Sequence, residues 1–380
     1  MYDVIVVGAG PAGCRVAELV AKKGFKVALI DKKKKIGQPV QCAGLISYRL
    51  KTILPDLPEN LLLNKINNAK FFSTGQKLEL KSKKHFYVVD REKLDRFLYL
   101  KARKAGAKTG LQVLFKSYKK KKESKEVEIR GGPFKQVKEE RSLIVSTGKG
   151  DIETKILVGA DGPKSTVAAA AGLLRPSNML IGAQLTVSAK GTFDPDAVEL
   201  FFSQDISPDF FGWVIPLNSD RARIGVAAKK GTATYLKRLV EKRTGEKVRA
   251  SLVKPDVAGH INSGLMERTS IDHVMVVGDA AAHIKPFSGG GVVYGLIGAG
   301  YCANACIRAL RDNNFSAEFL DCEYDKKWKS QLAGPIKRGM IYRRTLQGSD
   351  GQISDKKANL ILGLGRFAKT FIENFDVDLL

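Results

Sequence analysis

The residues best suited to chemistry in this sequence form a glycine-rich turn near its start, GAGPAG at residues 8–13. The turn follows an apolar stretch typical of a strand and opens a helical pattern. In such a turn Gly8 permits a sharp bend, Gly10 lets the backbone approach a pyrophosphate, and Gly13 allows the helix to pack on the strand. The free N–H groups of the helix then face the phosphates. The spacing therefore predicts a dinucleotide site.

An acidic residue follows the second strand-like stretch of this unit, residues 26–30. Asp31 is placed to accept hydrogen bonds from the ribose hydroxyls of a bound nucleotide. Strand, turn, helix, strand and acid occur in the order of a βαβ unit, so residues 4–31 are interpreted as an ADP-binding unit. Taken alone, this unit does not distinguish FAD from NAD.

Two later motifs carry further polar chemistry: VGADGPKS at residues 158–165 and VVGDAA at residues 276–281. A carboxylate at the end of a buried strand is well placed to accept hydrogen bonds from hydroxyl groups. The second motif leads into PFSGGGV at residues 286–292, which opens a long helical pattern. Its glycines let backbone N–H groups approach a ring edge, where the helix dipole can stabilise negative charge.

In this order the motifs resemble the fingerprints of the para-hydroxybenzoate hydroxylase fold, and more narrowly the geranylgeranyl reductase family, across nearly the whole chain. Three segments carry the narrower resemblance. KIGQPVQCAG at residues 35–44 is similar to the family's Gly-x-Pro-Val-x-Cys segment. VDREKLDRFL at residues 89–98 resembles its Asp-Arg-x-x-Leu/Phe-Asp segment, and PDFFGWVIP at residues 208–216 resembles its Pro-x-x-Tyr-x-Trp-x-Phe-Pro motif.

The chain also departs from the family pattern. Phe211 stands for the family's tyrosine and Ile215 for its phenylalanine. The usual archaeal cysteine motif continues with Ala/Gly-Glu-Gly, whereas here Cys42 is followed by Ala43, Gly44 and a leucine. Both the glutamate and the tyrosine hydroxyl are missing, which makes the expected pocket less polar.

The resemblance implies that the dinucleotide is FAD. It assigns Arg91 to the flavin and Asp279 to the ribityl chain. The predicted FAD contacts are Gly8, Gly10, Ala12, Gly13, Asp31, Lys32, Cys42, Ala43, Arg91, Val113, Asp161, Gly162, Asp279, Gly289, Gly290, Gly291 and Val292.

The resemblance further implies a reductase that saturates carbon–carbon double bonds of prenyl (geranylgeranyl) chains, in isoprenoid membrane lipids or their precursors. Reduced FAD would supply the hydride and a nearby acid the proton. The expected substrate pocket is apolar. Its residues are Phe210, Phe211, Trp213, Ile215, Pro216 and Tyr294. The alternative interpretation is that these side chains belong to an ordinary sheet core.

Two residues are candidates for the catalytic acid. Cys42 would position the substrate or deliver a proton, and its structural alternative is a small thiol packed against the flavin. His283 is the second candidate, with a satisfied histidine in a turn as its alternative. Lys285 could add positive potential near the reduced flavin.

Competing functions remain open at this point. One is a flavin monooxygenase of the same fold acting on an apolar substrate. Another is an RNA-binding flavoprotein, since the net charge is +25; neither lysine block, at residues 32–35 and 119–122, has interleaved aromatic residues, so no nucleic acid is expected. An apolar stripe at helical spacing over residues 357–375 leaves peripheral contact with an anionic membrane open.

Composition sets the remaining expectations. The five cysteines lack paired spacing, which argues against a disulfide framework and favours a reducing compartment. Cys302 and Cys306 lie one helical turn apart without a histidine cluster, so we interpret them as core residues and expect no metal. With no apolar run of spanning length and no signal peptide, a cytoplasmic location is expected, with association at the membrane surface as an open addition.

The order of the motifs predicts a mixed α/β fold. A discontinuous Rossmann-like FAD-binding domain would alternate with an antiparallel β-sheet substrate domain, followed by a C-terminal helical region. A lysine-rich hairpin is expected at residues 116–140. There is no second complete βαβ fingerprint, so NAD(P)H or reduced ferredoxin would be the electron donor. The predicted divisions are 1–67, 88–175 and 264–312 for FAD, 68–87 and 176–263 for the substrate sheet, and 313–380 for the helical region.

Overall fold

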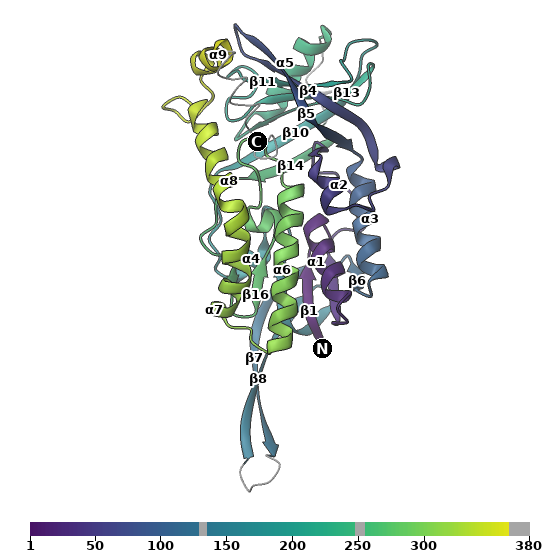
Figure 1. Cartoon of the computed structure of the whole chain (residues 1–380), viewed down its shortest axis with the longest axis vertical. Helices are drawn as coiled ribbons and strands as arrows, with labels where there is room; N and C mark the ends of the chain where they lie inside the picture. Colours follow the sequence, from purple (N-terminus) through teal and green to yellow (C-terminus); the bar gives the residue numbers. More distant parts are fainter. Residues whose placement is uncertain (129–134, 248–254, 365–380) are drawn as a thin grey trace.

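The computed structural model describes residues 1–128, 135–247 and 255–364. Two sheets, each with eight strands in the described part of the chain, lie at opposite ends of an elongated molecule (Figure 1). The predicted mixed α/β fold with a Rossmann-like part, an antiparallel sheet and C-terminal helices is confirmed.

The first sheet is parallel at its centre and carries the nucleotide motifs. Side chains of its first strand alternate between two buried cores: Val4 and Val6 enter one, and Ile5 and Val7 enter the other. Burial on both faces explains why these strands are continuously apolar. Its strand order is β15 (Ser270–Ile271), β16 (Val274–Val276), β9 (Gly150–Gly159), β1 (Tyr2–Val7), β2 (Val27–Asp31) and β6 (Lys108–Leu111).

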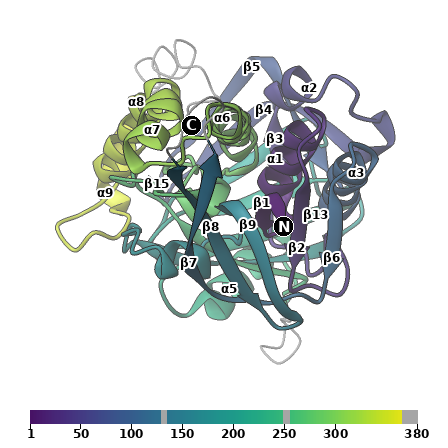
Figure 2. The same ribbon diagram turned by 90° about the horizontal axis from the view of Figure 1, so that it is seen from below.

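Helices from distant parts of the chain cover one face of this sheet (Figure 2). On the opposite face a second core is formed with a short helix, α4 (Thr166–Ala170), and with the inner end of an antiparallel hairpin that extends the same sheet. The covering helices are α1 (Pro11–Ala21), α3 (Arg91–Lys104), α6 (Val292–Asp312) and α8 (Lys326–Thr345).

The hairpin consists of β7 (Phe115–Glu128) and β8 (Lys135–Thr147), and β8 joins the first sheet beside β9. The lysine-rich hairpin predicted at residues 116–140 is thereby confirmed, although residues 129–134 lie outside the described range. In Figure 1 its far end projects from the lower end of the molecule.

The second sheet is antiparallel apart from the β11–β4 pair. α5 (Thr232–Thr244) packs against β13 and β10 on one side of it. Its strand order is β14 (Val257–Asn262), β10 (Met179–Ser188), β13 (Arg221–Ala228), β12 (Gly212–Pro216), β11 (Ala197–Phe201), β4 (Leu62–Phe72), β5 (Lys77–Val89) and β3 (Leu45–Ser47).

The division into domains remains a prediction, but the second sheet begins earlier in the chain than the predicted boundary. β3 and the start of β4 fall within residues 1–67 and nevertheless pair with β5. Short strands such as β3, and strands with internal glycine such as β14, give too little alternation to be found in the sequence.

The remaining elements are short segments and the C-terminal helices. They are α2 (Arg49–Ile53), η1 (Glu59–Leu61), η3 (Gly278–Ala281), α7 (Ala317–Leu320), the π-helical turn η4 (Asp321–Asp325) and α9 (Asp355–Gly363).

Among the described helices, α6 alone is long and apolar enough to cross a membrane. Of its most apolar stretch, 67% is buried inside the protein, as expected of a core helix. Cys302 and Cys306 belong to this buried side, which confirms their interpretation as core residues. Gly295 and Gly298 allow close approach of neighbouring backbone and side chains.

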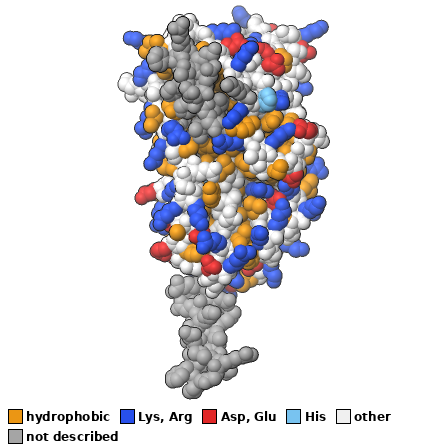
Figure 3. Space-filling view, viewed as in Figure 1, with side chains coloured by type: hydrophobic (Ala, Val, Ile, Leu, Met, Phe, Trp, Pro, Cys, Tyr) orange, Lys and Arg blue, Asp and Glu red, His pale blue; other side chains and the backbone are white. Residues whose placement is uncertain are grey.

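Basic side chains are spread over both halves of the face shown in Figure 3 rather than gathered in one patch. Several are paired with acids, for example Lys326 with Asp321 at 3.1 Å and Lys120 with Asp272 at 3.0 Å. Exposed pairs of this kind contribute little to stability.

Candidate functional site

The glycine turn between β1 and α1 is fixed by close backbone packing. Gly8 has a φ of 105°, and a β-carbon there would lie 2.2 Å from the carbonyl oxygen of Ala160. A β-carbon on Gly13 would lie 1.9 Å from the carbonyl oxygen of Gly8. A β-carbon on Gly10, in contrast, would meet nothing within 4 Å. The turn is therefore tight where it packs on the sheet and open at Gly10.

The first turn of α1 is free to receive an anion. Its N-cap, Gly10, offers no side-chain cap, and no acidic residue occupies the first turn. Ala12 packs so closely that a β-carbon on Gly278 would lie 2.9 Å from its own. Exposed N–H groups at a helix N-terminus without a competing carboxylate suit a pyrophosphate.

Asp31 is buried at the end of β2, and its carboxylate braces the turn. Oδ2 accepts a hydrogen bond from the Ala9 amide at 2.7 Å, and Oδ1 accepts one from the Lys33 amide at 2.8 Å. Each oxygen keeps a second lone pair for a ribose hydroxyl. Val113 is buried and donates its amide to the Asp31 carbonyl at 2.9 Å, whereas the Lys32 side chain is exposed.

Asp161 serves its own turn. Its carboxylate accepts hydrogen bonds from the hydroxyl of Ser165 at 2.5 Å, from the amide and hydroxyl of Thr166 at 2.7 and 2.9 Å, and from the amide of Val167 at 3.1 Å. Gly162 has a φ of 86° and faces open space. A ligand would therefore meet backbone here rather than the carboxylate.

Arg91 lies close to two other predicted FAD contacts, Cys42 and Asp279. Its guanidinium donates to Asp95 at 2.8 Å, and it interacts electrostatically with both Cys42 and Asp279. Burial lowers the pKa of Arg91, but the charge of Asp95 and the thiol of Cys42 outweigh it and hold the pKa above its ordinary value. Burial raises the pKa of Asp279 to about 6, against the opposing effect of Arg91.

These residues fit a flavin dinucleotide. The Nε of Arg91 is buried and has no hydrogen-bond partner within the part of the chain that the structure describes. A buried N–H without a partner indicates that a bound ligand supplies the hydrogen-bond acceptor. The open positions Gly10 and Gly162 and the uncapped start of α1 supply room and N–H groups for phosphates.

The glycine loop before α6 connects this cluster to the second sheet. A β-carbon on Gly291 would lie 2.7 Å from Oδ1 of Asp279. Gly289 has a φ of 72°, and a β-carbon there would lie 3.4 Å from both Phe210 and Ile261. The carbonyl of Gly290 accepts a hydrogen bond from the Lys285 amide at 3.0 Å, and α6 begins at Val292. The loop thus lies between the two groups of predicted residues.

Three aromatic residues and one isoleucine form an apolar wall on the second sheet, which we define as Phe210, Phe211, Trp213 and Ile215. The rings of Phe210 and Phe211 stack with centroids 4.1 Å apart, and Trp213 meets Phe211 edge-on at 6.3 Å. The Trp213 indole donates to Gln184 Oε1 at 2.9 Å. Pro216 is buried at the end of β12.

The structure does not bring Tyr294 into the apolar wall. Tyr294 lies on α6 in the core of the first sheet, with the Lys285 ammonium 5.7 Å from its ring centroid. A helical residue that is 1% exposed within another core is better described as packing. The prediction that Tyr294 lines the pocket was based on its position in the helix that follows the glycine loop, and that position does not bring it to the wall.

His283 lies in an environment that disfavours an acid. The ring is fully buried, and its centroid is 4.5 Å from that of Trp328. Nδ1 accepts a hydrogen bond from the Gly278 amide at 3.3 Å, and burial lowers the pKa of the imidazole to about 3. The histidine is held in the turn through Nδ1, but its buried Nε2 has no hydrogen-bond partner among the described residues, so the alternative of a satisfied histidine is matched only in part.

Cys42 lies in a loop held against the second sheet. Its Sγ accepts a hydrogen bond from the Gly44 amide at 3.4 Å. The next carbonyl, that of Ala43, accepts one from Arg223 at 2.8 Å. A β-carbon on Gly44 would lie 2.3 Å from the Arg223 guanidinium, so glycine at this position makes room for the arginine.

Sequence reasoning missed Arg223, Gln184 and Arg343. Arg343 donates to the Asp209 carbonyl at 2.8 Å and lies 5.2 Å from the ring centroid of Phe210. None of the three belongs to a motif, and strand register alone brings the first two beside the wall. For Gln184 alone the sequence held a signal: the indole of Trp213, if buried, needs a hydrogen-bond acceptor.

Comparison with known proteins places this geometry in a family. The family model described as FAD binding domain matches residues 1–312. A digeranylgeranylglycerophospholipid reductase of Methanothrix thermoacetophila is 30% identical, covering 88% of this chain and 85% of its own length. A reductase of the same name from Methanocaldococcus jannaschii is 29% identical over 98% of this chain and 95% of its own.

Solved structures agree on the fold. A geranylgeranyl bacteriochlorophyll reductase-like protein of Thermoplasma acidophilum is similar with a TM-score of 0.78 and 23% identity, covering 99% of this chain and 92% of its own. A p-nitrophenol 4-monooxygenase of Pseudomonas putida is similar with a TM-score of 0.68 and 14% identity, covering 98% and 96%. On the sequence matches, the chain belongs to the geranylgeranyl reductase family of FAD-binding proteins.

Proposed function

We propose that this protein is an FAD-dependent reductase that saturates carbon–carbon double bonds in the prenyl chains of isoprenoid lipids. Relatives named digeranylgeranylglycerophospholipid reductase match it over most of its length. The observation that carries the proposal is the glycine loop, where Asp279 adjoins Gly291 and the apolar wall adjoins Gly289. The segment of residues 289–291 therefore contacts both a predicted cofactor residue and the apolar wall.

Residues of the first sheet would hold the cofactor. The turn at residues 8–13 and the start of α1 suit the pyrophosphate, Asp31 the adenosine ribose, and Arg91 with Asp279 the flavin half. FAD in its reduced form would supply a hydride to one alkene carbon. The other carbon needs a proton, and Cys42 beside Arg91 is the side chain we assign to that role or to holding the substrate.

The apolar wall would hold the prenyl chain and exclude water. Its side chains are at most 8% exposed, and its buried indole is satisfied by Gln184, so an alkene meets no unpaired polar group there. Holding reactants in register without water is the main contribution that a protein makes to such a transfer.

Anaerobic incubation of the dithionite-reduced, FAD-loaded protein with geranylgeranyl lipids tests this function. Mass spectrometry should show a gain of two hydrogens for each bond reduced. If no lipid of a broad panel gains hydrogen while the flavin is bound and reduced, the proposal is wrong. Oxygen uptake stimulated by an apolar substrate would favour the monooxygenase alternative instead.

We also propose that the protein works in the cytoplasm at the surface of an anionic membrane, since its substrate is a lipid. Ile341 on α8, Leu360 on α9 and Leu364 just after α9 are 55%, 62% and 52% exposed, and Lys356 and Lys357 are the neighbouring basic residues on α9. The rest of the apolar stripe predicted at residues 357–375 lies outside the described residues. Sedimentation with anionic vesicles but not with neutral ones would support this; equal recovery with both would contradict it.

The electron donor is NAD(P)H or reduced ferredoxin in this proposal. Basic side chains spread over the surface suit docking of an acidic ferredoxin. Anaerobic mixing of the oxidised protein with each donor in turn, followed by flavin absorbance, identifies which one reduces it.

A further inference from the structure

Arg223 on β13 lies where three segments of the chain meet. Its Nη1 atom donates hydrogen bonds to the carbonyl of Ala43 at 2.8 Å and to the carbonyl of Val89 at 3.2 Å. The amide of Val89 in turn donates to the carbonyl of Gly44 at 2.8 Å. One side chain of the second sheet therefore joins the loop that carries Cys42 to the end of β5.

The two segments joined by Arg223 carry two of the predicted FAD contacts. Cys42 is the residue before Ala43. Arg91, the first residue of α3, follows Val89 by two positions. The Cys42 thiol interacts electrostatically with both Arg91 and Arg223. Because both hydrogen-bond acceptors are main-chain carbonyls, Arg223 fixes the backbone of both segments beside the thiol.

Gly44 makes room for this contact. It has a φ of 84°, and a β-carbon there would lie 2.3 Å from Nη1 of Arg223. The usual archaeal cysteine motif has glutamate two residues after the cysteine, and any side chain at that position would need the space that the guanidinium occupies. In this chain an arginine of the second sheet therefore fills the place next to the loop that a loop side chain would otherwise need.

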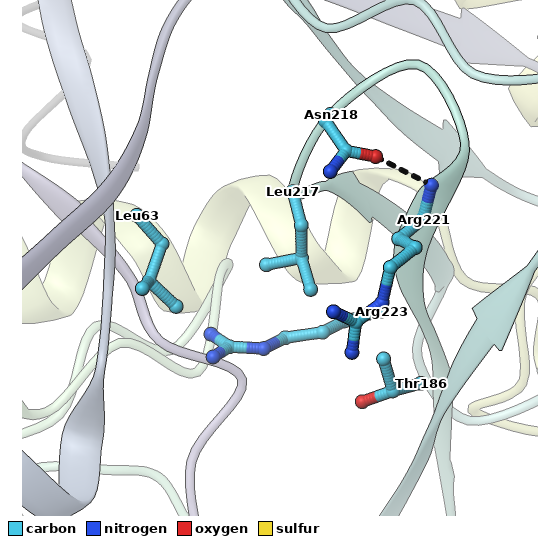
Figure 4. A pocket seen from close by; sticks show the side chains of 6 residues that line it. All are labelled: Leu63, Thr186, Leu217, Asn218, Arg221 and Arg223. Carbon is cyan, nitrogen blue, oxygen red and sulfur yellow. Dashed lines mark hydrogen bonds between the residues drawn. The ribbon is translucent and has the colours of Figure 1, made fainter.

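A neighbouring arginine lacks the contact with the loop. Arg221, two residues earlier on β13, lines with Arg223 a pocket of about 340 Å³. Figure 4 shows both side chains extending from β13 toward Leu63, with that of Arg223 reaching farther. Arg221 is exposed, and its guanidinium forms no hydrogen bond within the part of the chain that the structure describes. Two arginines of one strand thus differ in whether they hold the loop.

We propose that Arg223 is a positioning residue for Cys42: it holds the loop of residues 42–44 against the start of α3, so that the thiol stays beside Arg91. The inference rests on the proposed function and deepens it, since the role assigned to Cys42 needs a thiol that is fixed in place. Misplacement of a reacting group by about 1 Å can cost roughly a hundredfold in rate.

Alkylation of Cys42 by iodoacetamide tests the loop contact without turnover. The FAD-loaded protein carries Cys322→Ala, which leaves Cys42 as the one cysteine that is not buried. We expect Arg223→Met to raise the alkylation rate about tenfold, as loss of a hydrogen bond from a charged group predicts. Loss of a positive charge by itself would slow alkylation, because the thiolate is the reacting form. A faster rate therefore reports release of the loop.

Arg221→Met is the matched control, since it removes the same charge from the same strand, and it should be alkylated at the wild-type rate. Arg223→Lys keeps the charge without the planar fork of N–H donors, so its rate should lie between those of wild type and Arg223→Met. This variant also serves if Arg223→Met does not fold. An unchanged or lower rate in the Arg223 variants would overturn the proposal, and so would an equal rise in Arg221→Met.

Turnover at saturating FAD separates positioning of the thiol from a general loss of stability. In Arg223→Met the kcat for alkene reduction should fall about tenfold or more, while the KM for the lipid changes little. A raised KM with unchanged kcat would contradict the positioning role. If the wild type reduces no alkene, the proposed function fails, and the alkylation rates still show whether Arg223 holds the loop.

Discussion

Asp279 lies against the backbone of Gly291: a β-carbon on that glycine would be 2.7 Å from the carboxylate Oδ1. The strand end that carries the acid and the start of α6 are therefore packed as one unit. Any side chain at residue 291 must displace the carboxylate that we assign to FAD.

Gly291→Ala should consequently weaken FAD binding. Overpacking of a close contact costs about 1–3 kcal/mol, which corresponds to roughly a fivefold to hundredfold rise in the FAD dissociation constant. Flavin fluorescence during titration of the FAD-free protein measures it. Gly300→Ala is the matched control, because a β-carbon there meets nothing within 4 Å. Equal FAD affinity in both variants would refute the assignment.

Arg91→Lys should also lose FAD while the protein stays folded. Lysine keeps the positive charge but has no counterpart of the buried Nε, which lacks a partner in the described residues. We expect about a tenfold loss of affinity. Arg96→Lys, an exposed position on the same helix, should bind FAD normally. A normal affinity for Arg91→Lys would show that the orphaned nitrogen has no ligand.

Asp279 should make the FAD-free protein less stable as pH rises. Its pKa is raised from the usual 3.8 to about 6, so the folded state favours the protonated acid. The stability it contributes is full below pH 3.8 and is lost as pH rises through about 6. Asp279→Asn should lack this loss in urea unfolding between pH 4 and 7. Parallel pH curves for the two proteins would contradict the shift.

For His283 we expect the opposite pH dependence of folding stability from that of Asp279. Burial lowers its pKa from 6.5 to about 3, so its contribution to stability is present above pH 6.5 and is lost as pH falls toward 3. Wild type should therefore lose more stability than His283→Gln between pH 7 and 5. Since the ring is neutral when folded, the pH profile of turnover should keep its shape in the variant. A lost limb in that profile would restore the acid role to His283.

Cys42→Ala tests the remaining acid candidate. Removal of a proton donor lowers a rate by about a hundredfold or more, and turnover is compared at saturating FAD because Cys42 is also a predicted FAD contact. Cys322→Ala removes an exposed thiol and serves as control. Unchanged turnover in Cys42→Ala would make this cysteine a packing residue beside Arg91.

The tight glycine turn could be predicted from the sequence, because Gly8 and Gly13 are required by backbone contacts that any such turn makes. The ligand contacts assigned to that turn remain predictions. Asp161 shows the limit of this reasoning: the motif predicts a ligand contact there, yet its carboxylate is occupied by Ser165, Thr166 and Val167. Arg223 could not be predicted at all. Its position beside Cys42 follows from pairing between strands far apart in the sequence, which no local pattern encodes.

The β7 strand gives the lysine run a physical role of its own. Among the described strands β7 pairs only with β8, so its other edge is open. Open edges invite strands of other molecules to add to the sheet, and lysines along an edge oppose this by repulsion and by their hydration. Lys116, Lys119 and Lys120 are exposed on β7. Their replacement by threonine should promote self-association of the protein, an effect that needs no ligand or partner to explain it.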